Sequence, residues 1–346
     1  MYDNILINEN KTIHQALEKL NSLRDISRLI LFVIKNDGSV LGSLTDGDIR
    51  RSLADKANLL IKVGDICNRN FLYEDVKKEF LQLSSFRKKN IQILPILDKN
   101  KKIVRILDLE KIKSILPLEC MIMAGGRGKR LSPLTDNVPK PMLPLNGKPI
   151  LEHNIDRLIE FGIKKIYISV KYLGEKIQEY FGDGSQKGII IEYIWEEKPL
   201  GTGGALTLVD EFLTENVLLM NSDLFTDVNF EDLYLNHIKS KSDMVVSSTE
   251  YKVDIPFAVL DTNLTQVTDF KEKPSYIYHS NAGVYILKKK LISEIPKNKF
   301  YNITDLMNNL VKRGGKLIHY PIKGFWIDIG SPTDYIQAQE LIKHLN

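Results

Sequence analysis

Apolar positions recur in the same order twice within the first third of the chain. Residues 32–53 can be laid over residues 95–116 so that apolar side chains coincide along both segments. The coinciding pairs are Val33 with Ile96, Val40 with Ile103, Leu44 with Leu107, and Ile49 with Ile112. Upstream, the helical spacing of residues 12–21 recurs in residues 75–84. A repeated order indicates two copies of one structural unit, and each copy is predicted to be helix, strand, turn, strand and helix.

After the repeats, the pattern changes to one typical of an α/β protein. Residues 120–124 form a short apolar run that ends in glycines, which predicts a buried strand entering a loop. Apolar runs within residues 162–170 and 215–225 are typical of buried parallel strands. They alternate with helix-period segments at 150–162 and 173–182, each closed by a glycine. We therefore predict an α/β fold with its ligand site at the C-terminal ends of the strands.

The composition is that of a soluble globular protein with two or three domains. The chain has 346 residues, of which 43% are hydrophobic and 27% charged. Its net charge of +4 is too small for this length to indicate a nucleic-acid partner. Cys67 and Cys120 show neither CxxC nor Cys/His spacing, so no disulfide framework or zinc site is expected. No signal-peptide pattern and no long apolar stretch is present, which predicts a cytoplasmic protein with no membrane partner.

Three glycines follow the strand predicted at residues 120–124. Gly125, Gly126 and Gly128 would let backbone N–H groups approach a phosphate, because a Cβ there would hold the ligand away. A bare turn after the strand is the alternative. Neither a P-loop nor a GxGxxG motif is present, since Arg130 follows Lys129 and Leu131 stands where the third glycine would be.

Two cations lie close to these glycines on a backbone that prolines restrain. Arg130 and Lys140 are ten residues apart, and Lys140 lies between Pro139 and Pro141. Two positive charges on a restrained loop suit a polyphosphate, and a solvated basic loop is the alternative. The stretch is therefore a candidate cradle for a chain of phosphates.

The segment "GGRGKRLSPLT" followed by "VPKPMLPL" resembles the signature of the sugar-1-phosphate nucleotidylyltransferases, GGxGxRL and then PKP. The resemblance extends over residues 118–346, with Lys129 as a departure where many members carry threonine. It implies a Rossmann-like, mixed-sheet nucleotidyltransferase domain. It also implies transfer of a nucleoside monophosphate from a nucleoside triphosphate (NTP) to a sugar 1-phosphate, with release of pyrophosphate.

The resemblance implies roles for individual residues in this domain. Catalysis would use Arg130, Lys140, Asp223 and Asp328, with the two aspartates as ligands of Mg²⁺. The nucleotide would be bound by Ala124, Gly125, Gly126, Gly128, Gly201 and Thr202. The sugar phosphate would be bound by Gly204, Glu272, Lys273, Asn281 and Gly283. Either aspartate alone could instead be a turn or helix-capping residue.

The N-terminal repeats resemble a tandem pair of CBS (cystathionine-β-synthase) domains over residues 1–117, an α+β module with repeats at about 1–60 and 61–117. In that family a threonine and an aspartate bind the ribose of an adenine nucleotide, and Thr45 and Asp48 match them. Asp108 and Lys111 stand at these positions in the second repeat. Thr45 and Asp48 could also cap a helix, so both interpretations stay open. The repeats imply a regulatory or oligomerising module and a homo-oligomer.

The fusion of such repeats to this transferase most resembles the guanylyltransferases of bacterial legionaminic acid biosynthesis. It implies GTP and glucosamine 1-phosphate as substrates. The alternatives within the family are mannose- or heptose-1-phosphate guanylyltransferases and glucose-1-phosphate uridylyl- or thymidylyltransferases. A GT-A glycosyltransferase is disfavoured, because Asp223 and Asp227 are four residues apart and form no DxD motif. A non-catalytic CBS nucleotide sensor would not need the transferase residues, all of which are present.

Overall fold

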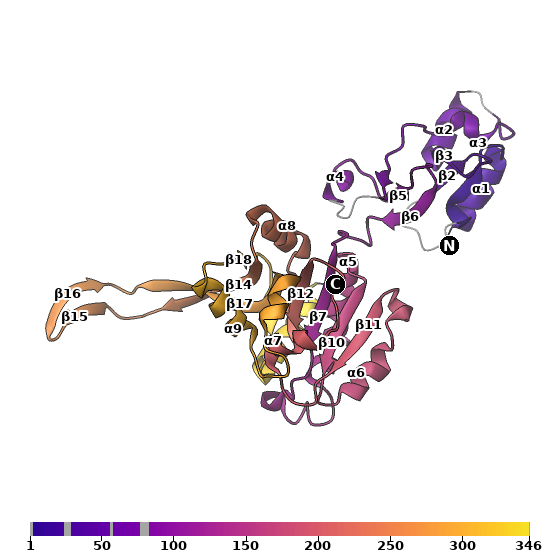
Figure 1. Cartoon of the computed structure of the whole chain (residues 1–346). Helices are drawn as coiled ribbons and strands as arrows, with labels where there is room; N and C mark the ends of the chain where they lie inside the picture. The colour runs from indigo at the N-terminus through magenta and orange to yellow at the C-terminus, as the bar shows by residue number, and fades with distance from the viewer. Residues whose placement is uncertain (1–2, 24–28, 56–57, 77–82, 346) are drawn as a thin grey trace. The chain divides into compact units, whose positions relative to one another are not determined.

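The computed structural model describes residues 3–23, 29–55, 58–76 and 83–345. The chain divides into two compact units (Figure 1). Unit 1 comprises Met1–Leu116 and Glu160–Gly162, and unit 2 comprises Pro117–Ile159 and Ile163–Asn346. Each unit encloses apolar clusters of its own. Among the described residues, no helix has the length and apolar character needed to cross a bilayer.

The first repeat of unit 1 is a three-stranded sheet with helices. Its elements are β1 (Leu6–Asn8), α1 (Ile13–Ser22), β2 (Ile30–Ile34), β3 (Val40–Thr45), α2 (Asp46–Ala54) and the short α3 (Val63–Ile66). Strand β2 pairs in parallel with β1 and antiparallel with β3. Helix α1 begins at a capping box formed by Thr12 and Gln15, and it buries Ile13, Ala16 and Leu20 in the core of this repeat.

The second repeat reproduces the strand register of the first. Its elements are β4 (Glu74–Asp75), α4 (Ser84–Arg87), β5 (Ile93–Leu97) and β6 (Ile103–Asp108). Ile30 pairs with Thr45 in the first repeat, and Ile93 pairs with Asp108 in the second. The apolar order predicted this correspondence. Most of the helix expected at residues 75–84 lies outside the described residues, because 77–82 are not among them.

The helix predicted at the end of the second repeat is not formed. In the first repeat Thr45 caps α2, since its Oγ1 accepts from Asp48 N at 3.3 Å while Thr45 N donates to Asp48 Oδ2 at 2.8 Å. In the second repeat Lys111 has no side-chain acceptor with which to close such a box. Asp108 instead accepts from Glu110 N at 3.0 Å, residues 109–111 form a turn, and no helix follows as far as residue 117. The prediction of a closing helix is therefore wrong for this repeat.

Unit 2 is built on a seven-stranded sheet in the order β11-β10-β7-β12-β17-β14-β18. The strands are β7 (Leu118–Met123), β10 (Lys165–Val170), β11 (Ile190–Trp195), β12 (Asn216–Asn221), β14 (Met244–Asp254), β17 (Ser275–Lys288) and β18 (Leu317–Pro321). Only β17 runs against its neighbours in this sheet. The predicted α/β fold with a mixed sheet is confirmed.

Unit 2 has six α-helices among its described residues, and α5 and α6 occupy the two glycine-closed segments that the sequence predicted. The six helices are α5 (Ile150–Glu160), α6 (Gly174–Phe181), the short α7 (Gly201–Gly204), α8 (Phe230–Ser240), α9 (Ile303–Lys312) and α10 (Pro332–Lys343). Gly182 ends α6 with a φ of 54°. Helix α9 packs Ile303, Leu306 and Leu310 into the same apolar cluster as Met121 of β7. The central strands are thereby fixed in the core.

Three short ladders complete unit 2. Two lie close to the sheet, β8 (Pro144–Leu145) with β9 (Lys148–Pro149), and β13 (Leu224–Thr226) with β19 (Trp326–Asp328). The third is the hairpin of β15 (Val259–Asn263) and β16 (Gln266–Lys271). This hairpin is the outer part of a long two-stranded projection formed by residues 249–280, here called the arm (Figure 1).

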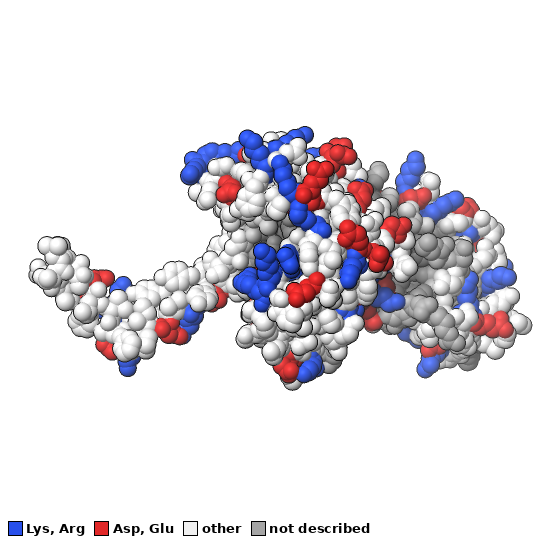
Figure 2. All heavy atoms as spheres, turned by 90° about the horizontal axis from the view of Figure 1, so that it is seen from below, with Lys and Arg blue, Asp and Glu red and all other residues white. Residues whose placement is uncertain are grey.

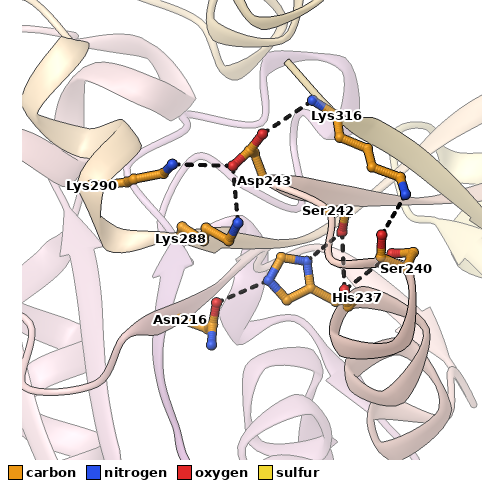
Figure 3. Close-up of polar contacts among 8 residues, drawn as sticks. All are labelled: Asn216, His237, Ser240, Ser242, Asp243, Lys288, Lys290 and Lys316. Atoms are coloured by element: carbon orange, nitrogen blue, oxygen red, sulfur yellow. Dashed lines mark hydrogen bonds and ion pairs between the residues drawn. The ribbon is translucent and has the colours of Figure 1, made fainter.

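A buried polar network fixes the end of α8 against the sheet (Figure 3). His237 is only 1% exposed, and its Nε2 lies 2.9 Å from Asn216 Oδ1 and its Nδ1 2.7 Å from Ser242 Oγ. An amide oxygen only accepts, so this arrangement assigns the proton to Nε2. Burial, with Lys288 nearby, lowers the pKa of His237 to about 4. The imidazole is therefore held neutral inside the fold.

Unit 2 should lose stability as the pH falls from 6.5 towards 4. His237 stays neutral in the fold through this window but takes up a proton when the chain unfolds, so acid favours unfolding. The loss attributable to His237 should be about 3 kcal/mol. The measurement is denaturant unfolding followed by tryptophan fluorescence, since both tryptophans, Trp195 and Trp326, lie in unit 2. His237→Asn should flatten this part of the pH profile, and an unchanged profile would contradict the assignment.

Candidate active site

The candidate site lies where β7 and β12 end side by side in the sheet. Met123 at the end of β7 pairs with Asn221 at the end of β12. Because β10 lies on the other side of β7, the chain leaves β7 at a topological switch point, where α/β sheets bind ligands. A pocket of about 630 Å³ opens here. Its lining is Met123, Gly125, Gly126, Arg127, Lys171, Tyr172, Glu196, Pro199, Gly201, Thr202, Asn221, Asp223 and Phe300.

The loop after β7 presents backbone donors to this pocket. Ala124 is buried, and its N–H still donates to Ser169 O of β10 at 2.8 Å. The N–H groups of Gly125, Gly126 and Arg127 donate to no acceptor among the hydrogen bonds of the described residues. A Cβ added at Gly126 would meet nothing within 4 Å, so the space in front of it is open. These donors suit the oxygens of a phosphate.

Gly128 turns the loop back towards Lys140. Its φ of +66° lies in the left-handed region that favours glycine. A Cβ at this position would stand 3.0 Å from the Cβ of Lys140. Gly128 therefore allows the glycine loop and the "PKP" segment to pack closely, which explains the spacing that the sequence shows.

Lys140 meets the two predicted metal ligands. The β13–β19 ladder pairs Leu224 with Asp328, and Ile329 N donates to Asp223 O at 3.0 Å. This ladder brings together aspartates that are far apart in sequence. The Lys140 amine forms an ion pair with Asp223, and it lies 4.0 Å from Asp328 Oδ1. Lys140 is only 9% exposed, whereas the side chain of Asp328 is 46% exposed, so the cluster opens to solvent on the Asp328 side.

The cluster has the electrostatics of a site that can take a further cation. Burial and the negative charge of Asp223 raise the pKa of Asp328, although Lys140 and Arg130 act in the opposite direction. The Arg130 guanidinium lies over the backbone of Gly330, where a Cβ would be 3.3 Å from Nη2. No group of three or more His, Cys, Asp or Glu side chains with metal-binding geometry occurs among the described residues. Two carboxylates with open positions fit Mg²⁺, which keeps waters and phosphate oxygens as ligands.

A second loop closes the pocket from the side of β11. Glu196 is 9% exposed and accepts from the Ser169 hydroxyl and, at 2.9 Å, from Leu200 N. Gly201 and Thr202 line the pocket, and the Thr202 hydroxyl accepts from Ile303 N at 3.0 Å. The loop is thus fixed at both ends by hydrogen bonds within the chain.

Gly204 serves packing in this structure and does not line the pocket. Its N–H donates to Tyr301 O at 2.8 Å, and a Cβ would stand 2.7 Å from Lys299 O. Residues Gly201–Gly204 form the four-residue helix α7. Gly204 therefore allows α7 to pack closely against residues 299–301, which precede α9.

The predicted sugar-phosphate residues are not all brought together. Gly283 has a φ of +74°, and a Cβ there would be 2.7 Å from the side-chain nitrogen of Asn221, which lines the pocket. Gly283 N donates to Asn281 Oδ1 at 3.0 Å, so this pair adjoins the pocket. Glu272 and Lys273 lie exposed on the arm. Lys273 is eight residues from Asn281, about 25 Å along an extended chain. The structure does not bring Glu272 or Lys273 to the pocket.

Comparison with known proteins supplies the family. A family model described as nucleotidyl transferase matches residues 119–344. The chain belongs to the nucleotidyl transferase family. In this nucleotidyl transferase a CBS domain model also matches residues 1–55, which is the first of the two repeats.

Curated relatives of this nucleotidyl transferase include guanylyltransferases. Mannose-1-phosphate guanyltransferase beta-A of Xenopus laevis is 31% identical over 227 residues, and the match covers 63% of each chain. D-glycero-alpha-D-manno-heptose 1-phosphate guanylyltransferase of Aneurinibacillus thermoaerophilus is 34% identical over 233 residues, covering 66% of this chain and 99% of the relative. The chain therefore spans less than two thirds of the Xenopus protein but nearly all of the bacterial one.

A solved structure shares the fold of the nucleotidyl transferase unit. HddC from Yersinia pseudotuberculosis complexed with GMP-PN superposes with a TM-score of 0.51 and is 28% identical. The match covers 65% of this chain and 99% of HddC. Together with the family model, this agrees with the α/β class and the mixed sheet of unit 2.

Sequence reasoning missed several residues of this nucleotidyl transferase pocket. Arg127 lies with its guanidinium 5.4 Å from the centre of the Tyr172 ring. The Tyr172 hydroxyl donates to Asp136 O at 2.8 Å, which links the end of β10 to the loop between Gly128 and Lys140. Lys171 Nζ donates to Glu197 O at 2.6 Å. Lys171 and Tyr172 directly follow a predicted parallel strand, and that position was the available signal, because ligand sites collect at C-terminal strand ends.

Gly128→Ala should destabilise unit 2 by about 1–2 kcal/mol, because a side chain disfavours the left-handed backbone and would crowd Lys140. Gly126→Ala is the matched control in the same loop and should change stability by less than about 0.5 kcal/mol, since its Cβ enters open space. Denaturant unfolding monitored by tryptophan fluorescence measures both changes. Equal effects of the two substitutions would contradict the role given to Gly128.

Proposed function

We propose that the protein transfers a nucleoside monophosphate from an NTP, with GTP as the preferred donor, to a sugar 1-phosphate, giving a nucleotide sugar and pyrophosphate. One observation carries the proposal. Asp223 lines the switch-point pocket together with Gly125, Gly126 and Arg127, and it pairs with the buried Lys140, which lies 4.0 Å from Asp328 Oδ1. Family membership and the guanylyltransferase relatives support the same reaction class.

The reaction needs two anions to meet, and the residues of the site address that problem. Like unit charges 4 Å apart repel by about 4 kcal/mol at an effective dielectric constant near 20, and both substrates carry several charges. The N–H groups of the glycine loop and the Arg130 guanidinium would hold the triphosphate. A sugar-phosphate oxygen would attack the α-phosphorus in line, forming a P–O bond while the bond to pyrophosphate breaks. No protein nucleophile is required.

The aspartates and Lys140 would organise charge around the reacting phosphates. Asp223 and Asp328 would hold Mg²⁺, which would supply positive charge to phosphate oxygens. Lys140 lies between the two carboxylates. Its positive charge, with those of Arg130 and Mg²⁺, would also stabilise the departing pyrophosphate. Burial of Lys140 strengthens these interactions by excluding water.

The base and the sugar rest on different kinds of support. Two relatives are named as guanylyltransferases, and HddC was crystallised with GMP-PN, which supports GTP. Glucosamine 1-phosphate, and a place in legionaminic acid or surface-glycan biosynthesis, rest on the resemblance of the CBS fusion to enzymes of that pathway. The relatives' names favour mannose or heptose 1-phosphate as the alternative acceptor. Binding of an adenine nucleotide at Thr45 and Asp48 stays a prediction, and in this structure both residues cap α2.

Pyrophosphate release in the presence of Mg²⁺ tests the reaction and its substrates. We expect release with GTP and glucosamine 1-phosphate and little with ATP, UTP, CTP or dTTP. Mannose, glucose and heptose 1-phosphates are the competing acceptors in the same assay. Release with another pair would keep the reaction and replace the substrates. No release from any pair, despite NTP binding, would contradict the proposed transfer.

Asp223→Asn should lower kcat by about 10²-fold or more, because it removes a charge that acts on the reacting phosphates. Asp227→Asn is the matched control, since Asp227 lies four residues away, after β13, and does not line the pocket. It should retain near-normal turnover. The measurement is steady-state pyrophosphate release at saturating substrates. Similar losses in both variants would remove Asp223 from the site.

A further inference from the structure

The arm concentrates exposed apolar side chains far from the pocket. Of the 26 large hydrophobic side chains that are exposed among the described residues, eight lie within this one projection. They are Tyr251, Phe257, Leu260, Leu264, Val267, Phe270, Ile277 and Tyr278. Leu264, at the turn of the hairpin, is 94% exposed. Figure 2 shows the arm as a mainly uncharged surface with only a few acidic and basic side chains.

The apolar residues are segregated by strand pairing. In the inner ladder Tyr251 is opposite Tyr278 and Val253 is opposite Tyr276, so these four side chains share one face. The other face carries mainly polar pairs. They are Glu250 with His279, Lys252 with Ile277, and Asp254 with Ser275.

The outer ladder is segregated in the same way. Leu260 is opposite Phe270 on one face. Asp261 is opposite Asp269 on the other, beside the pair of Val259 and Lys271. Each ladder is therefore a ribbon with one apolar and one polar face, which is the pattern of a sheet that is covered on one side.

No strand of the described residues pairs with either ladder of the arm beyond its root. Strand β18 pairs with β14 only from Met244 to Ser248, and β12 pairs with β17 only from Val284 to Lys288. Beyond those points the arm has two strands, whereas stable sheets in water need three or more strands or a packed layer. Such a concentration of exposed apolar side chains is typical of a contact surface for another molecule.

We propose that the arm is a self-association surface, on which a second copy of this chain packs its own arm, apolar face against apolar face. The same patch meets itself about a two-fold axis, as in an isologous dimer. An arm about 50 Å long and 10 Å wide offers on the order of 500 Å² per face. Two arms together bury on the order of 1,000 Å², the size at which specific interfaces begin.

The charges on the arm favour a second copy over a strongly charged partner. The polar faces carry both signs, with Lys252 and Lys271 beside Asp254, Asp261 and Asp269. A mixed surface gives no field that would attract nucleic acid or an anionic membrane. Two apolar faces can pack together without charge complementarity, so two identical arms can cover each other's apolar side chains.

The test is a pair of double variants in the full-length chain. Tyr278→Thr with Phe270→Thr removes one large side chain from the apolar face of each ladder. The control, His279→Thr with Asp269→Thr, makes the same number of substitutions at adjacent positions on the polar face. Threonine favours strands, so both arms should keep their pairing. Circular dichroism and tryptophan fluorescence check that both variants fold.

Sedimentation equilibrium and hydrogen exchange report the outcome. The dissociation constant for self-association should rise at least about tenfold in the apolar-face variant and stay near the wild-type value in the control. In the wild type, the amides of residues 249–280 should become more protected as the protein concentration rises. Concentration-independent exchange in the arm, or wild-type association of the apolar-face variant, would overturn the proposal. Association without arm protection, for instance through the CBS repeats, would overturn it too.

Discussion

The charge cluster of Lys140, Asp223 and Asp328 is the constraint on which the rest of unit 2 depends. The three residues come from distant parts of the chain, and each needs its own support. The sheet places Asp223 at the end of β12, the β13–β19 ladder brings Asp328 beside it, and the prolines with Gly128 direct Lys140 inward. The buried Lys140 amine is compensated by the two carboxylates only because each of these separate elements brings its residue to the same place.

Much of this arrangement could be predicted from sequence because its signals are local. The glycines after β7, the prolines around Lys140 and the helix-closing glycines each act on their own neighbours. The register of the two N-terminal repeats could be anticipated for a related reason, since equal apolar spacing fixes equal pairing. In these cases the residue and its structural consequence lie within a few positions of each other.

The positions that could not be predicted from sequence share a different physical cause. The pocket roles of Arg127 and Tyr172 depend on two strands meeting, which no local pattern specifies. The position of Lys273 depends on how far an exposed ladder extends from the sheet before it turns. The closing helix of the second repeat was predicted from apolar spacing alone, and it does not form. Its start lacks the reciprocal hydrogen bonds that Thr45 and Asp48 provide in the first repeat.

Strand β17 gives unit 2 a mechanical linkage. It begins in the arm, crosses the left-handed Gly283 beside Asn221, and ends in the core of the sheet. Its partner β14 has a register irregularity between Val246 and Ser248, opposite the same point. One continuous strand therefore joins the inner ladder of the arm to Gly283, which packs against Asn221 in the wall of the pocket.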